Sequence, residues 1–96
     1  MKQVQIVFNA AIEVELMQCL KKNGVHTYTK FPNIYGVGTH SEPHMGSHIW
    51  PGENHMLLIV TEDEQVPAIL TCVRELKKRK QREGIKAFVL PVEEII

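Results

Sequence analysis

The feature that most constrains this chain is a pattern of apolar residues that occurs twice. In its first copy, residues 3–8 alternate between apolar and polar, as in a half-buried strand. Apolar residues then recur across 12–20 at the spacing of one helix face. Asn9 offers an N-cap for this helix, and Asn23-Gly24 ends it, because glycine adopts the left-handed conformation without a steric penalty.

A second strand is predicted from about Val25, and the pattern then recurs. Residues 55–60 form an apolar strand, followed by a Thr61-Glu62-Asp63-Glu64 sequence with the spacing of a capping box. Apolar residues across 66–76 mark a second helix, and residues 85–92 a final strand. The predicted order is therefore strand, helix, strand, strand, helix, strand.

This order is that of an α+β domain with the ferredoxin-like βαββαβ fold. Right-handed crossovers bring the strands of each half into one sheet. Interleaving the halves gives an antiparallel sheet of order 4-1-3-2, with both helices on one face. The apolar stretch 56–60 suits a central strand, whereas Pro32 lacks the N–H group of a paired strand and belongs on an edge. We expect residues 1–96 to form a single domain whose open sheet face favours self-association.

Charge and composition exclude several classes of protein. Eleven Lys and Arg residues balance eleven Asp and Glu residues, so no net charge attracts nucleic acid or an anionic membrane. No apolar run approaches the roughly 20 residues that span a bilayer, and residues 1–5 lack the apolar core of a signal peptide. The two cysteines are too few for a disulfide-stapled secreted domain. We therefore expect a cytoplasmic protein with free thiols, Cys19 in the core and Cys72 partly exposed, with no nucleic-acid partner and no direct membrane insertion.

Histidines gather between the two halves. His40, His44 and His48 follow one another at intervals of four residues, and Met45 lies among them. Imidazole binds Cu, Ni, Co or Zn, and a thioether favours Cu(I). The pattern predicts a transition-metal site at His40, His44, Met45 and His48, against the alternative that these are solvated loop side chains. His55 begins a strand and is predicted to be structural.

Two glycines lie where the second predicted strand ends. Gly36 and Gly38 flank Val37, and a backbone without side chains can closely approach a phosphate. A bulge or tight turn at the strand exit explains the same residues. A cofactor contact at Gly36 and Gly38 is therefore one of two possible interpretations, and a bulge or turn is the other.

Catalysis and RNA recognition find little support. No nucleophile is paired with a base, and the first arginine is Arg74, whereas acylphosphatase-like catalysis needs an arginine cradle early in the chain. RNA-binding sheets of this topology carry aromatic residues for base stacking on their central strands. Here the stretch 55–60 has none and the first strand has only Phe8. We expect neither an enzyme nor an RNA-binding protein.

Three short motifs resemble the PII-like superfamily of trimeric signalling proteins: Tyr35-Gly36-Val37-Gly38, Trp50-Pro51-Gly52-Glu53-Asn54 and Gly84-Ile85-Lys86-Ala87-Phe88-Val89. The resemblance implies a homotrimer in which an effector loop, about residues 39–54, contacts partners and small ligands bind between subunits. Nitrogen-sensing members also carry a glycine-rich nucleotide loop after the second helix, with Thr-Gly and Gly-Asp-Gly-Lys elements. This sequence lacks those elements, which argues against an adenine nucleotide.

Two hypotheses follow. The chain is also similar to CutA-type metal-tolerance trimers, so the first is a trimeric PII-like regulator that binds a transition metal through its His/Met-rich loop. Such a role is linked to metal homeostasis or efflux, with a membrane transporter or another protein contacting the loop. The alternative is a PII-like or ACT-like sensor that binds a nucleotide or metabolite in inter-subunit clefts without a metal, with Gly36 and Gly38 at the ligand.

Overall fold

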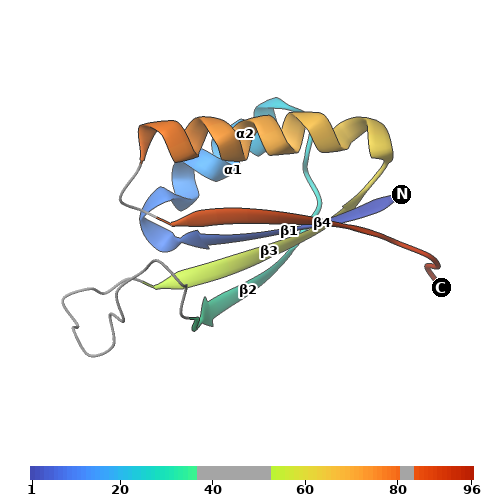
Figure 1. Ribbon diagram of the computed structural model, residues 1–96, viewed down its shortest axis with the longest axis horizontal. Coiled ribbons are helices and arrows are strands. Elements are labelled where there is room, and N and C mark those ends of the chain that lie inside the picture. Colours follow the sequence, from blue (N-terminus) through green and yellow to red (C-terminus); the bar gives the residue numbers. More distant parts are fainter. Residues whose placement is uncertain (37–52, 81–83) are drawn as a thin grey trace.

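The computed structural model describes residues 1–36, 53–80 and 84–96. Both helices lie on one face of a single sheet (Figure 1). A short 3-10 turn precedes each helix, at Ala10–Ile12 and at Asp63–Gln65. The elements are β1 (Lys2–Asn9), α1 (Glu13–Lys22), β2 (Thr29–Ile34), β3 (Asn54–Thr61), α2 (Val66–Arg79) and β4 (Ile85–Pro91). This is the α+β ferredoxin-like fold that the repeated pattern predicts.

The sheet has the order β2-β3-β1-β4, and all neighbouring strands are antiparallel. Read from the other edge, this is the predicted order 4-1-3-2. The apolar strand β3 is central, and β2, which contains Pro32, forms an edge as predicted. The β2–β3 register shifts between Phe31 and Ile34. Asn33 lies within this shift and has a positive φ of 55°.

Two local predictions are wrong. β2 begins at Thr29 rather than near Val25, because Val25 still belongs to the helix end: its N–H donates to Leu20 O at 2.9 Å and its side chain is buried. The capping box does not form, because Thr61 pairs with Lys2 as the last residue of β3 and Glu62 makes no side-chain cap bond. The predicted glycine at the end of α1 is confirmed by the φ of +84° at Gly24.

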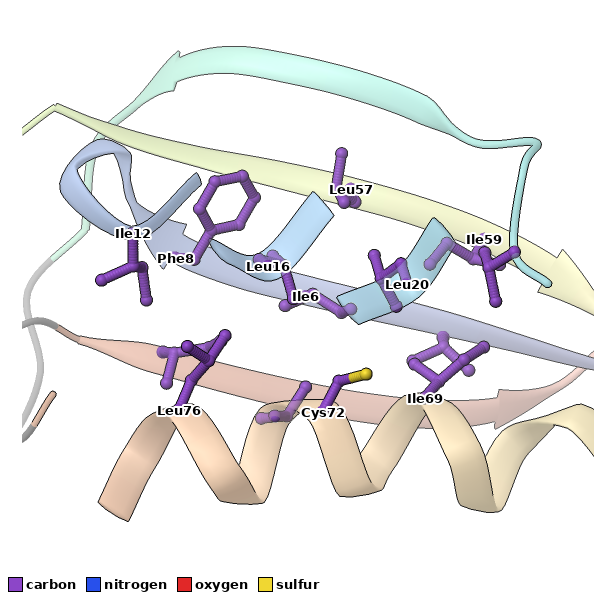
Figure 2. Close-up of a cluster of buried hydrophobic side chains, with 14 residues drawn as sticks. Ile6, Phe8, Ile12, Leu16, Leu20, Leu57, Ile59, Ile69, Cys72 and Leu76 are labelled. Carbon is purple, nitrogen blue, oxygen red and sulfur yellow. The ribbon is translucent and has the colours of Figure 1, made fainter. Parts of the chain in front are cut away.

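The hydrophobic core lies between the helices and the sheet face that they cover (Figure 2). Residues opposite each other in antiparallel strands share a face, and the pairs Val4–Ile59 and Ile6–Leu57 both face the helices. The helices close this layer with Leu16, Leu20, Ile69, Cys72 and Leu76, all buried. Removing these side chains from water is the main favourable term in folding.

Asn9 links the end of β1 to the turn before α1. Its side chain is 7% exposed, and its Oδ1 accepts the Ala11 N–H at 2.8 Å. We expect Asn9→Ala to lower the free energy of unfolding by about 1 kcal/mol, because it leaves that N–H without its acceptor. Urea unfolding measures the change, and Asn9→Asp, which keeps an oxygen at the same place, is the control. An equal loss in both variants would contradict a capping role.

Candidate functional site

A groove of about 460 Å³ lies between α2 and the edge strand β4. Residues four and three apart on a helix share a face, so α2 presents one apolar and two basic side chains to the groove. The opposite wall is β4, whose Ala87 and Val89 lie on the helix-facing side of the sheet. The lining residues are Leu70, Arg74, Lys77, Lys86, Ala87, Phe88 and Val89. The groove therefore combines apolar walls with the two helix cations Arg74 and Lys77, has Lys86 on the strand at its edge, and has no acidic residue in its lining.

The charges of these cations are not compensated within the described chain. Arg74, Lys77 and Lys86 form no salt bridge with another described residue. Arg79 and Lys80, further along, instead lie 3.9 and 3.5 Å from Glu15. Arg and Lys side chains beside a groove whose lining has no carboxylate attract anions, and phosphates above all. This groove is suited to an anionic ligand with an apolar part.

Sequence reasoning missed this groove. Lys77 belongs to a basic run that is typical of a solvated helix end, and Arg74 stands out in the sequence only as its first arginine. Their relation to Lys86 depends on the sheet order, which places β4 at the edge beside α2. The available signal was the spacing of Leu70, Arg74 and Lys77 on one helix face.

A second polar cluster lies at the start of β3. His55 is 7% exposed, and its Nδ1 accepts the Asn33 N–H at 3.0 Å. The ring proton therefore lies on Nε2, which is 3.7 Å from Glu13 Oε1. Lys30 Nζ lies 2.7 Å from the other oxygen of Glu13, and the ring of Phe8 meets the imidazole edge to face at 5.8 Å. His55 is thus structural, as predicted: it holds the irregular edge strand β2 in place.

The predicted ligand-contacting glycines are only partly described. Gly36 follows the end of β2, and no described atom lies within 4 Å of a Cβ placed on it. Gly38 lies outside the described residues. Their role as cofactor contacts therefore stays a prediction.

The predicted metal ligands, His40, His44, Met45 and His48, all lie outside the described residues. The predicted effector loop, about residues 39–54, is described only from residue 53 onward. Within the described ranges, no group of three or more His, Cys, Asp or Glu side chains is arranged to hold a metal ion. Neither α1 nor α2 combines the length and the apolar character of a membrane-spanning helix.

The two cysteines differ from their prediction. Cys19 and Cys72 form a disulfide, with their Cα atoms 5.9 Å apart, and Cys72 is 1% exposed. The prediction of free thiols, with Cys72 partly exposed, is wrong because α1 and α2 pack together and place these positions opposite each other. The two residues are 53 positions apart in the sequence, and their spacing gave no sign of this proximity.

The sequence matches the family model of nitrogen regulatory protein P-II over residues 1–96. It is 30% identical over 96 residues to the nitrogen fixation nifHD1 region GlnB-like protein 1 of Methanosarcina barkeri, covering 98% of this chain and 90% of that protein. The crystal structure of a protein from Thermus thermophilus, described as PII-like and signalling, is similar with a TM-score of 0.65 and 26% identity, over 92% of this chain and 82% of that one.

A structure of CPII, a PII-like protein from Thiomonas intermedia, bound to ADP and bicarbonate, has a TM-score of 0.67 at 20% identity. It covers 97% of this chain and 88% of that one. Another CPII structure holds ADP, AMP and bicarbonate. The ligands of these relatives overturn the prediction of Cu, Ni, Co or Zn as the cofactor, and the described residues supply no metal cluster.

Proposed function

The chain belongs to the family of nitrogen regulatory protein P-II, and on this premise we propose that it is a regulatory protein that senses an adenine nucleotide. The observation that carries the proposal is the groove between α2 and β4. Its helix cations, Arg74 and Lys77, suit the phosphates, and Leu70 with Val89, which lies on the helix-facing side of β4, offers apolar surface for the base. The ligands of CPII, ADP and AMP, combine these same two chemical parts.

We further propose a homotrimer. The sheet face away from the helices carries apolar side chains. Leu58 and Phe88 lie on this face, one on each side of Gln5 of β1, with which both are paired. Phe88 is 50% exposed, and Val60 and Leu90 are each 39% exposed. Patches of this kind mark sites of association. A second copy packed beside the edge strand β4 would close the groove, which makes the ligand site a cleft between subunits.

The remaining parts of the proposal follow from this role. Residues 1–96 act as one domain, and the protein is not an enzyme: ligand binding changes its contacts with other proteins. The effector loop, about residues 39–54, makes these contacts, with a membrane transporter among the partners to test. We place the protein in the cytoplasm, where adenine nucleotides are available.

Calorimetric titration of the full chain with ATP, ADP and AMP, each with and without bicarbonate, tests the nucleotide proposal. We expect saturable binding of at least one nucleotide, and about tenfold weaker binding in Lys77→Ala, because a charge-assisted bond to phosphate is lost. Lys78→Ala is the matched control: Lys78 is exposed on the same helix but does not line the groove.

Three nucleotides that all fail to bind at millimolar concentration would refute the proposed function. Equal losses of affinity in Lys77→Ala and Lys78→Ala would show that the nucleotide responds to overall charge and that the groove is not its site.

A further inference from the structure

We propose that Cys19 and Cys72 form a reversible thiol–disulfide site that fastens the two helices together and exchanges with small thiols and disulfides. Each half of the chain contributes one of the two cysteines. Cys19 lies in the second half of α1 and Cys72 in the middle of α2. The 5.9 Å between their Cα atoms falls within the range in which a disulfide forms without moving the backbone. This inference does not depend on nucleotide binding.

The two cysteine residues differ in their exposure to solvent. Cys72 is 1% exposed and points from α2 into the core (Figure 2). Cys19 is only half-buried and packs against the margin of that core. A thiol from solvent therefore reaches Cys19 first. Because one cysteine is partly exposed and the other is buried, the site has the asymmetry of an attacked cysteine and a resolving cysteine.

The side-chain amide of Asn23, at the end of α1, lies next to both sulfurs. Asn23 Nδ2 lies 3.7 Å from Cys19 Sγ and 3.5 Å from Cys72 Sγ. The same amide donates to Cys19 O at 2.8 Å, and Gln65 Nε2 donates to Asn23 O. An amide N–H directed at sulfur stabilises a thiolate, so Asn23 is placed to assist whichever sulfur leaves during exchange.

The reduction balances with two equivalents of a small thiol. A thiolate RS⁻ attacks Cys19 Sγ, the bond between Cys19 and Cys72 breaks, and Cys72 leaves as a thiolate that takes up a proton. A second RS⁻ attacks the external sulfur of the mixed disulfide, which releases RSSR and the Cys19 thiolate. Two electrons pass from the small thiols to the protein, and oxidation by RSSR is the reverse.

Reduction frees α2 from α1 and loosens the helix layer. The disulfide joins positions 53 residues apart, so it restricts a long stretch of the unfolded chain, and such links stabilise folded domains considerably. We expect the thermal midpoint of the full chain to fall by about 10 °C or more when the disulfide is reduced.

The experiment equilibrates the full chain in mixtures of reduced and oxidised glutathione and then alkylates free thiols for intact-mass analysis. Both thiols should appear together in one two-electron transition. In Cys72→Ser, oxidised glutathione should form a stable mixed disulfide at Cys19, whereas in Cys19→Ser the sheltered Cys72 should react far more slowly. Alkylation of both cysteines in every mixture, or equal reactivity of the two single variants, would overturn the proposal.

Thermal unfolding gives an independent readout. Dithiothreitol should lower the midpoint of the natural chain and leave that of the double variant, Cys19→Ser with Cys72→Ser, unchanged. A midpoint of the natural chain that does not respond to dithiothreitol would refute the fastening role, whether or not the variants fold.

Discussion

Replacement of Phe8 by alanine is expected to lower the free energy of unfolding by about 3–5 kcal/mol. Phe8 is 1% exposed in β1 and is among the largest side chains that are fully buried. It contacts His55 edge to face at 5.8 Å. Truncation removes its buried area and leaves a cavity beneath the helices. Small domains have a stability of about 5–15 kcal/mol, so this single change would remove a large share of it.

Urea unfolding of Phe8→Ala, followed by circular dichroism, measures this loss. Tyr35→Ala is the matched aromatic control: Tyr35 is 96% exposed beyond the end of β2. We expect its unfolding free energy to stay within about 0.5 kcal/mol of the natural chain. A loss below about 1 kcal/mol for Phe8→Ala would contradict the position of the core.

Substitution of Leu58 by glutamate is expected to dissociate the proposed homotrimer into folded monomers. Leu58 lies in the middle of β3, between Gln5 of β1 and Thr29 of β2, on the face away from the helices. In a trimer that buries this face, each copy would bring a carboxylate out of water without a partner. Desolvating an unpaired charge costs several kcal/mol, and the threefold arrangement repeats that penalty while adding repulsion.

Sedimentation velocity gives the masses of the natural chain and of Leu58→Glu, and circular dichroism reports whether the variant stays folded. Val14→Glu supplies the control: it adds the same charge at a residue that is 69% exposed on α1, in the layer opposite to the open face. We expect this control to remain assembled. A natural chain that is monomeric at tens of micromolar would refute the trimer, and an intact Leu58→Glu assembly would place its interface elsewhere.

Much of the fold can be predicted from short stretches of the sequence. The alternation in β1, the glycine after α1 and Pro32 on the edge strand each depend on a few neighbouring residues, and all three predictions are confirmed. The capping box failed because a local pattern competed with strand pairing: Thr61 pairs with Lys2 across the sheet. Predictions from neighbouring residues are therefore correct where a residue makes no competing contact with a distant part of the chain.

The candidate site was less accessible to sequence reasoning, because it is built from distant residues. Arg74 and Lys86 share a groove only once β4 lies at the edge beside α2. Cys19 and Cys72 bond only once the helices pack together. The histidine pattern suggested metal because of its residue types, but spacing alone does not fix a coordination geometry. The groove and the disulfide, which depend on how distant elements pack together, are therefore found only in the structure.

The interleaved sheet has a consequence for how this protein is made. β1 pairs with β3 and β4, and β2 pairs with β3, so every pair of strands joins the first half of the chain to the second. A nascent chain therefore cannot form a single ladder of the sheet until β3 has left the ribosome. Because the pairing is entirely long-range, the sheet assembles late and largely at once. Until then, β1 and β2 have no strand to pair with.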